Sequence, residues 1–379
     1  MNRFWVTCQV LTVFWVGVLG VAWAGTWELK QRTKLMSKNT KLLHSLTRFS
    51  GLGMVLFVVV LSIFSGQGSL QATPQAEREL TEKDIDRWMT ELSNWGRWGP
   101  KDQLGAVNLI TPEKQKQAAG LVREGISLSL ARPLNKEKSL DNPVPFEHVM
   151  LRNGVDDPNR SSADSYAISY HGSAFTHLDA LSHFFHNGKM YNGFSQQEVT
   201  REGAGKLDIL TLKNGIFTRA ILVDIPRLKG IPYLEQGTPI YPEDLEAWER
   251  EIGVRISSGD VIFVRTGRWA RRAVVGPFTS SSGMAGLHAS CARWLKERDV
   301  AMVGTDGVGD VRPSGIEGPG FPLHRLLLVA LGVPIFDNTD LEELAETAAR
   351  LNRWEFLLTV APMPVPGGTG SPVNPIATF

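Results

Sequence analysis

The hydrophobic pattern divides the chain into an apolar N-terminal segment and a longer part with periodic patterns. Residues 4–24 form one apolar run, and basic and polar residues separate it from a second run at residues 52–64. The second run is short for a transmembrane helix but has the length of the apolar core of a signal peptide. We therefore predict a leader over residues 1–72 and one globular domain over residues 73–379.

Two interpretations of this leader remain open. In the first, translation starts at Met36, and the second apolar run belongs to a signal peptide that is cleaved after Ala72. In the second, both runs form a membrane hairpin that stays attached. Either interpretation predicts a periplasmic or secreted domain, which is membrane-anchored if the leader is uncleaved. The leader is then the chain's only expected contact with a membrane.

Along the domain, segments with the hydrophobic spacing of a helix alternate with continuous apolar runs. Ile85, Trp88, Met89 and Leu92 recur at the spacing of one helix face, and Thr81 precedes them as a fair helix start. Continuous apolar runs such as residues 220–225 favour strands that are buried on both faces. The predicted helices are 112–124, 242–250, 286–297 and 324–331, and the predicted strands are 126–130, 166–170, 220–225, 261–265, 301–306 and 333–336.

One stretch, residues 135–165, lacks a regular pattern, so we predict a loop of the kind that often forms a lid beside a site. His148 falls within it, and we expect that side chain to be structural or to contact substrate. Asp306 ends a predicted strand, where we expect its carboxylate to bond the backbone of a turn. His288 is expected to cap or pack within its helix, and a contact with the site is the alternative.

Charge and cysteine content restrict the classes of partner. Removing the seven Lys/Arg and the one acid of residues 1–72 from totals of 40 and 39 leaves 33 and 38, a net charge of −5. A mildly acidic domain gives no reason to expect nucleic acid as a partner. Cys291 is the only cysteine of the domain, since Cys8 lies in the leader, so no disulfide forms within the domain.

The candidate site residues are concentrated between positions 171 and 186, where histidines are frequent. His177 and Asp179 are two residues apart, so their side chains share one face of an extended backbone. Imidazole nitrogen and carboxylate oxygen bind Zn²⁺ at about 2 Å. His183 follows Asp179 by four residues and overhangs the same face if a helix begins there. A lone His-x-Asp is more often structural than ligating, so the neighbouring groups matter.

A second histidine and carboxylate pair occurs far downstream. His324 begins an apolar helix that Gly332 closes, and the following strand runs to Asp337. A helix followed by a returning strand can bring the two side chains together, which would add ligands to the first pair.

These motifs resemble one known family. The segment HGSAFTHLDALSHF contains His177, Asp179 and His183 in a spacing similar to the signature of the cyclase family, metal-dependent hydrolases that include bacterial kynurenine formamidase and isatin hydrolase. Other matching stretches are NWGRWGPKDQLGAVNLITPEK, GDVIFVRTGRW, HRLLLVALGVPIFDNTDL and GGTGSPVNPIA. The resemblance implies the family's α/β fold, in which helices flank a β-rich, barrel-like core.

The resemblance also implies a ligand set. His177 and Asp179 would bind a first metal, and His324 with an acidic residue about a dozen positions later would complete a second position. Asp337 stands at that acidic position, where the family has glutamate. Ser173 stands where the short formamidases have a histidine. His171, two residues earlier, takes the place of that histidine only if the chain forms a local bulge. With His171 the first metal has two imidazoles; without it, the site holds one metal with Asp179 bridging toward His324.

The function that the resemblance implies is hydrolysis of a carbon–nitrogen bond in a small amide or cyclic amide. The cofactor is a divalent metal, Zn²⁺ or Mn²⁺, and His183 is the expected general base. The expected partners are a small-molecule substrate and further copies of the chain, as a homodimer or homotetramer. A second hypothesis is a secreted metal-binding protein of the same fold without hydrolytic activity, which the departures at Ser173 and Asp337 favour.

Overall fold

The computed structural model describes residues 79–156, 160–318 and 320–379. These residues belong to one unit of the chain, Gln71–Phe379. The predicted leader, its two apolar runs and the two interpretations of its fate lie outside the described residues. Among the residues that are described, no helix is both long enough and apolar enough to cross a membrane.

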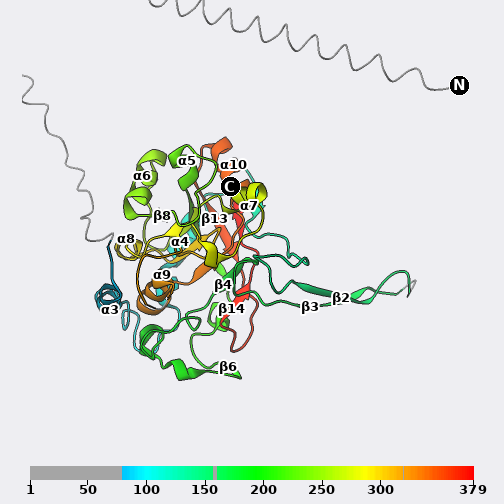
Figure 1. The fold of residues 1–379 in the computed structure, drawn as a ribbon, viewed down its shortest axis with the longest axis horizontal. Helices are drawn as coiled ribbons and strands as arrows, with labels where there is room; N and C mark the ends of the chain where they lie inside the picture. Colours follow the sequence, from blue (N-terminus) through cyan, green and yellow to red (C-terminus); the bar gives the residue numbers. More distant parts are fainter. Residues whose placement is uncertain (1–78, 157–159, 319) are drawn as a thin grey trace, which may run out of the picture. The chain divides into compact units, whose positions relative to one another are not determined.

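A mixed sheet of nine strands forms the centre of the domain (Figure 1). Its inner strands β7, β9, β11 and β12 run parallel, and the remaining neighbours pair antiparallel. In spatial order the strands are β1 (Ser127–Ser129), β15 (Ile376–Thr378), β13 (Glu355–Val360), β7 (Ile216–Asp224), β9 (Val261–Arg265), β11 (Met302–Thr305), β12 (Ile335–Asp337), β4 (His177–Asp179) and β14 (Gly370–Pro372).

The sheet curls back on itself. Ser129 of β1 and Pro372 of β14 belong to opposite ends of the strand order, yet both line one surface pocket. The predicted α/β fold with a β-rich, barrel-like core is therefore confirmed. Smaller two-stranded pairs lie outside this sheet: β2 (Glu147–Arg152) with β3 (Ala163–Ala167), β5 (Val199–Thr200) with β6 (Gly203–Ala204), and β8 (Pro239–Ile240) with β10 (Gly286–Leu287).

Helices flank the sheet, and their starts follow local sequence signals. Asp84 accepts hydrogen bonds from the backbone N–H and the hydroxyl of Thr81, which fixes the start of α3. Thr111 accepts from the N–H of Lys114 and Pro112 takes the first position of α4. The helices are α3 (Glu82–Glu91), α4 (Pro112–Ala119), α5 (Ile225–Lys229), α6 (Pro242–Ile252), α7 (Arg268–Val275), α8 (Cys291–Glu297), α9 (Pro322–His324) and α10 (Glu342–Leu351), and Arg325–Leu331 continues α9 as a π-helix.

The predicted apolar strands form the core. β7, β9 and β11 are buried over nearly their whole length, as continuous apolar runs require when helices cover both faces. Gly304 of β11 lets Phe263 of β9 pack directly against the backbone, because a Cβ at Gly304 would lie 2.4 Å from the Phe263 ring. Strand β12 continues the sheet beside β11 and pairs with β4, and these two strands carry candidate site residues.

Several predicted boundaries were wrong, and each for a local reason. The irregular stretch 135–165 contains β2 and most of β3. The strand predicted at 166–170 ends at Ala167, because the chain turns at Gly172 with a φ of +140° before entering β4. The helix predicted from residue 286 begins only at Cys291, since Gly286 and Leu287 pair with β8 as a strand. The helix predicted over 112–124 ends at Ala119, before Gly120.

Candidate metal centre

Strand β4 carries the central pair of side chains. It lies between β12 and β14 and runs antiparallel to both. His177 and Asp179 face one side, while Leu178 between them is fully buried on the other. In the register with β12, His177 lies opposite Asp337. The strand pairing alone therefore brings three of the candidate ligands to one face of the sheet.

The remaining candidates converge on the Asp179 carboxylate. Its Oδ1 lies 3.1 Å from Nδ1 of His171 and 3.4 Å from Nε2 of His177. Its Oδ2 lies 3.7 Å from Nε2 of His324 and 3.8 Å from Nε2 of His183. The structure thus brings His171 and His324, which are 153 positions apart, to the same carboxylate.

Two overlapping groups of these atoms have the spacing of metal ligands. His171, Asp179 and His183 form one, and His177, Asp179 and Asp337 form the other, with the ligand atoms of each group within 4.8 Å of one another. Asp179 belongs to both. Asp337, although one methylene shorter than glutamate, places its Oδ2 3.5 Å from Nε2 of His324 and so reaches the cluster.

Hydrogen bonds from the outer side of each ring aim the imidazoles inward. Nδ1 of His177 lies 2.8 Å from the carbonyl oxygen of Phe175 and donates to it, which leaves the Nε2 lone pair facing Asp179. Nδ1 of His324 lies 2.5 Å from Oδ2 of Asp310. Nε2 of His171 lies 3.1 Å from the Thr369 hydroxyl, so that its Nδ1 faces Asp179. Ring nitrogens held in this way are oriented for metal binding.

The buried carboxylates of this cluster lack hydrogen-bond partners. Both oxygens of Asp179 and Oδ1 of Asp337 are buried and accept no hydrogen bond. Buried carboxylate oxygens are otherwise almost always paired, and removing a charge from water costs several kcal/mol unless a counter-charge compensates it, about 20 kcal/mol in the Born limit. Unpartnered oxygens surrounded by imidazole nitrogens are the donor set of a divalent cation, so these residues fit a metal.

The charged groups of the cluster shift one another's pKa values. Burial alone would raise the pKa of Asp179, but the charges of His183 and His177 outweigh it and hold this pKa well below its ordinary value. Burial alone would lower the pKa of His324, but the carboxylates of Asp337 and Asp310 outweigh it and raise this pKa well above its ordinary value. Metal binding at His324 must therefore displace a proton.

His183 behaves differently from the other histidines of the cluster. Burial, followed by the nearby charges of His171, His324 and His177, lowers its pKa to about 4, although Asp179 opposes the shift. Its ring stacks on that of His171 at a centroid distance of 3.9 Å. A neutral imidazole at neutral pH has a free lone pair and can accept a proton.

A buried arginine fixes the loop that precedes β4. Arg268 donates to the carbonyl oxygen of Ser173 at 2.5 Å and to the side chain of Asn338. Asn338 in turn donates to the carbonyl oxygens of Gly172 and Phe175, at 2.7 and 3.2 Å. This network holds the backbone between His171 and His177, and Ser173 takes part through its carbonyl oxygen.

Sequence reasoning missed the residues that support the ligands. Asp310 and Thr369 contact ligands from distant loops, and no local spacing in the sequence marks either residue. The prediction for Asp306 is confirmed, since it accepts from the backbone N–H groups of Thr266 and Gly267. Thr176 donates to the carbonyl oxygen of Asn338 at 2.7 Å.

Other histidines lie outside the cluster. His148 contacts Asp164 at 2.9 Å on the β2 and β3 hairpin. His288 is buried with its Nδ1 2.9 Å from the Ser290 hydroxyl, in agreement with the packing role that we expected. His186 lies 3.0 Å from Asp86.

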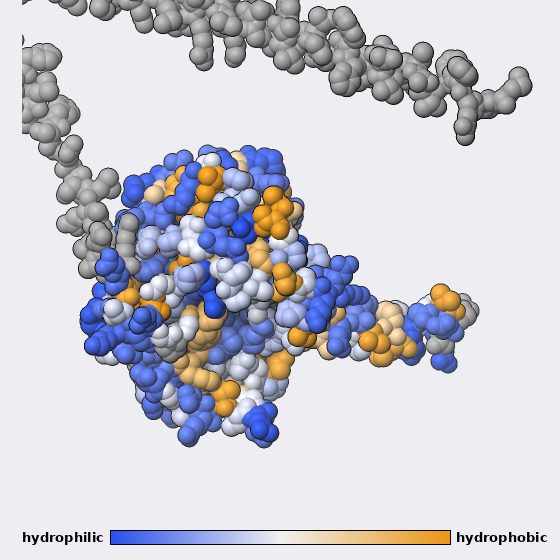
Figure 2. All heavy atoms as spheres, viewed as in Figure 1, coloured by the Kyte–Doolittle hydropathy of each residue, from blue (hydrophilic) through white to orange (hydrophobic). Residues whose placement is uncertain are grey.

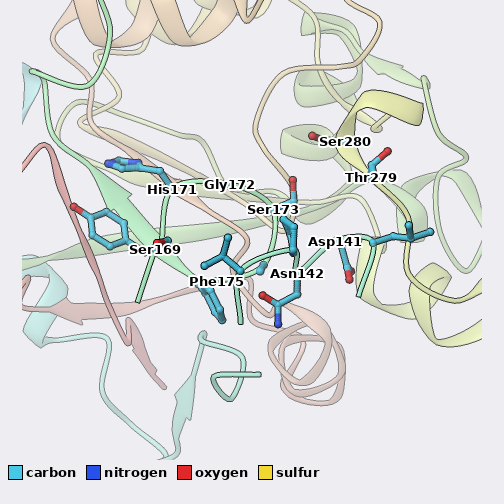
Figure 3. A pocket seen from close by; sticks show the side chains of 14 residues that line it. Asp141, Asn142, Ser169, His171, Gly172, Ser173, Phe175, Thr279 and Ser280 are labelled. Carbon is cyan, nitrogen blue, oxygen red and sulfur yellow. The ribbon is translucent and has the colours of Figure 1, made fainter. Parts of the chain in front are cut away.

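A surface pocket lies beside the cluster. Figure 3 shows His171 on one side of this pocket and Thr279 and Ser280 on the other. Its lining combines apolar groups with hydroxyls and includes Leu140, Val144, Tyr170, Ser173, Phe175, Thr279 and Ser280. Because His171 belongs to both the pocket and the cluster, a small molecule in the pocket would contact a candidate metal ligand.

Comparison with known proteins places the chain in a family. A family model described as putative cyclase matches residues 111–309. The chain belongs to this family. It is 34% identical to a protein whose crystal structure is described as that of a novel cyclase; the match covers 76% of this chain and 99% of that chain, with a TM-score of 0.70. The resemblance predicted from the motifs is therefore confirmed.

More distant solved structures also match the chain. Isatin hydrolase A from Labrenzia aggregata, bound to benzyl benzoate, is 19% identical over 69% of this chain and 94% of that chain, with a TM-score of 0.48. Isatin hydrolase A from Ralstonia solanacearum is 18% identical over 69% of this chain and 93% of that chain, with a TM-score of 0.48. None of the curated proteins matches the chain. Membership of the cyclase family supports a hydrolase that uses a divalent metal.

Proposed function

We propose that this protein is a metal-dependent hydrolase that cleaves the carbon–nitrogen bond of a small amide or cyclic amide, in the manner of an arylformamidase. The observation that carries the proposal is the buried Asp179 carboxylate, whose oxygens have no hydrogen-bond partner and which lies among the imidazoles of His171, His177, His183 and His324. Such a site is costly to the fold without a cation, which is typical of a functional centre.

His177, Asp179, His171, His324 and Asp337 would hold the metal. A divalent cation bound there, Zn²⁺ or Mn²⁺, polarises the substrate carbonyl and lowers the pKa of a water molecule. Imidazole suits zinc and carboxylate suits manganese, and the cluster offers both. Asp310 and Thr369 keep His324 and His171 in the ligating orientation.

His183 is the candidate general base. Its Nε2 lies 3.8 Å from Oδ2 of Asp179, and its side chain is a quarter exposed, so it lies at the open side of the cluster. With a pKa of about 4 the imidazole is neutral at pH 7 and accepts the proton of the attacking water at Nε2. Protonated His183 then donates this proton to the leaving nitrogen, which completes hydrolysis without a net change in the protein.

The pocket next to His171 is the proposed substrate site. Phe175 and Tyr170 supply apolar surface, and the hydroxyls of Ser173, Thr279 and Ser280 supply hydrogen-bonding groups. Apolar walls with a few polar groups are usual for small-molecule sites. The departure from glutamate at Asp337 favours a second candidate function, a metal-binding protein without hydrolytic activity.

The proposal includes an extracytoplasmic location. The apolar run at residues 52–64 with its preceding basic residues favours export of the domain, either as a periplasmic or secreted protein or attached through an uncleaved leader. Mass spectrometry of the native protein tests this, because an intact peptide from residues 25–35 would contradict a start at Met36.

Metal analysis followed by an activity assay separates the two functions. The purified protein, loaded with Zn²⁺ or Mn²⁺, is assayed against N-formyl aromatic amines and cyclic amides. Turnover that requires metal and falls in Asp179→Asn supports the hydrolase. Bound metal without turnover on either substrate class supports the second function. Full activity after complete metal removal contradicts both.

A further inference from the structure

Two phenylalanines lie against the histidines of the candidate metal centre. The ring of Phe184 lies 5.0 Å from that of His183 and 5.1 Å from that of His324, centroid to centroid. The ring of Phe321 lies 5.5 Å from that of His324 and 6.0 Å from that of Phe184. Both phenylalanines are only partly buried, so aromatic surface stays accessible beside the candidate general base. In the view of Figure 2, hydrophobic residues on the body of the domain lie in small groups among hydrophilic ones.

The backbone of Phe321 is in a conformation that bulky residues rarely adopt. Its φ is +62° and its ψ is +55°, in the left-handed region, and it directly precedes Pro322 at the start of α9. The same short helix carries His324. Strained residues of this kind persist only where the surrounding structure holds them, and they are frequent at ligand sites. The position of the Phe321 ring is therefore a feature to which a bound molecule would give a function.

An arginine lies on the ring of Phe321. The guanidinium carbon of Arg312 is 4.3 Å from the ring centroid, and this side chain is half-buried. In the part of the chain that the structure describes, the guanidinium makes no hydrogen bond and no ion pair. Stacking occupies the face of a guanidinium and leaves the N–H groups in its plane free. Two of those N–H groups match the two oxygens of a carboxylate, which makes Arg312 a receptor for an anion.

The backbone holds this arginine in a fixed place relative to the metal centre. Arg312 donates its N–H to the carbonyl oxygen of Met284 at 2.8 Å and accepts from the N–H of Met284 at 2.9 Å. Two residues earlier, Asp310 accepts from Nδ1 of His324 at 2.5 Å. One short segment thus positions both the cation and a candidate metal ligand. A receptor that is ordered before binding loses little conformational entropy when the ligand arrives.

The proposed hydrolysis gives the leaving group a direction. His183 passes a proton to the leaving nitrogen, so the leaving group lies on the His183 side, where Phe184 contacts that ring. We propose that Arg312, Phe321 and Phe184 form a leaving-group subsite that selects amides whose leaving amine is an aromatic ring with a carboxylate. The direction rests on the proposed function. The pocket beside His171 remains for the acyl part.

A matched pair of substrates isolates the carboxylate. Hydrolysis of para-formamidobenzoate breaks the bond between the carbonyl carbon and nitrogen, and water supplies a hydroxyl to the carbon and a proton to the nitrogen. The products are formate and para-aminobenzoate. Formanilide undergoes the same reaction and gives aniline. The two substrates share the ring and the reacting bond, so a difference between them reports the carboxylate. Neutral amides, neutral cyclic amides included, use the rings of the subsite but not Arg312.

Binding of the leaving amines tests the subsite without turnover. The purified protein, loaded with Zn²⁺, is titrated with para-aminobenzoate and with aniline in a calorimeter. We expect para-aminobenzoate to bind more tightly than aniline. Arg312→Gln should weaken its binding about 10-fold, the low end for hydrogen bonds to a charged group, because Arg312 is partly exposed. Arg312→Lys should recover part of the loss, since lysine keeps the charge but not the two-pronged geometry.

Two further variants separate the contributions. Arg227 of α5 also lies on an aromatic ring, with its guanidinium carbon 5.2 Å from the centroid of Trp354. Arg227→Gln is therefore the matched control, and we expect both amines to bind as they do to the wild type. Phe321→Leu removes the ring that both amines share and should weaken both. Circular dichroism and metal content of every variant establish that the fold is intact.

Steady-state kinetics give a second measure. The carboxylate is remote from the reacting bond, so Arg312 stabilises the bound substrate and the transition state alike. We expect Arg312→Gln to raise the KM of para-formamidobenzoate relative to that of formanilide, also about 10-fold, with a smaller effect on kcat.

Two results would overturn the subsite. One is equal affinity of the wild type and Arg312→Gln for para-aminobenzoate. The other is binding of para-aminobenzoate that disappears when the metal is removed and is insensitive to Arg312→Gln, because the carboxylate then binds the metal. Binding that depends on Arg312 without turnover of either formyl compound supports the subsite and contradicts the hydrolase. Turnover of both compounds with equal KM ratios in the wild type and Arg312→Gln contradicts the subsite alone.

Discussion

Asp310 offers the sharpest test of how the candidate metal centre is held. Its carboxylate accepts from the backbone N–H of Leu323 at 2.8 Å, from that of His324 at 3.2 Å and from Nδ1 of His324 at 2.5 Å. The substitution Asp310→Asn keeps the volume but replaces one acceptor oxygen by an amide donor. Either orientation of the amide loses at least one of these bonds and sets a donor against an N–H group.

The structure sets the size of the effect. A hydrogen bond to a charged group contributes about 1.5–3 kcal/mol, and loss of the group that orients a ligating histidine costs about 10–100-fold in metal affinity. That range equals about 1.4–2.7 kcal/mol of binding free energy at 1.36 kcal/mol per tenfold. We therefore expect Asp310→Asn to bind Zn²⁺ about 10–100-fold more weakly than the wild type, measured by competition with a chromophoric chelator.

Asp224→Asn is the matched control for this experiment. Asp224 is also a buried aspartate at a helix start, where it accepts from the N–H of Arg227 at 3.2 Å and pairs with Arg265 at 2.8 Å. It touches none of the cluster histidines. We expect the control to lose unfolding free energy in urea while it keeps its metal affinity. The reasoning is refuted if Asp310→Asn binds metal as tightly as the wild type, or if both variants lose affinity equally.

The remaining predictions concern charge and proton transfer. Asp179→Asn should lose bound metal and turnover together by elemental analysis and assay, and retention of full metal content would contradict its ligand role. His183→Ala should keep its metal but lose about 10²–10⁴-fold in kcat, the usual contribution of a general base. Because burial holds the pKa of His183 near 4 in the folded state, against about 6.5 unfolded, the unfolded state binds more protons between these values. As pH falls from 7 to 5, the free energy of unfolding of the metal-free protein should therefore decrease, by on the order of 1 kcal/mol more than that of metal-free His183→Gln. The difference is this small because partial exposure of His183 screens the effect. Equal decreases in the two proteins, measured by unfolding in urea, would count against this reasoning. Burial raises the pKa of Cys291 well above its ordinary value, so this thiol should resist a thiol reagent at pH 8 until the protein unfolds.

The parts of the site that the sequence predicted are those with a local signal. His177 and Asp179 share a face because a strand has a period of two, and that period is visible in the sequence. The buried strands β7 and β9 were predictable because burial on both faces gives a continuous apolar run. The approach of His324 to Asp337 was inferred from a helix and a returning strand, and the structure places Nε2 of His324 3.5 Å from Oδ2 of Asp337.

The β2 and β3 hairpin escaped prediction for the opposite reason. Hydrophobic periodicity reports burial of one face, and β2 and β3 bury neither face, so their sequence carries no regular alternation. The bulge between Met150 and Arg152 shifts the register further. Asp310 was missed because its contact with His324 joins two loops through the tertiary fold, which no local spacing records.

The end of strand β12 explains how the cluster forms with an aspartate at position 337 and no histidine at position 173. Asp337 points into the cluster, and the next residue, Asn338, adopts a φ of +56° that turns its side chain toward the loop before β4. Asn338 then bonds the carbonyl oxygens of Gly172 and Phe175, so one strand end positions both a carboxylate and the loop that presents His171. A histidine at position 173 is not needed for this geometry, because the turn at Gly172 already brings Nδ1 of His171 to 3.1 Å from Asp179. The serine at that position contributes its backbone oxygen to Arg268 instead.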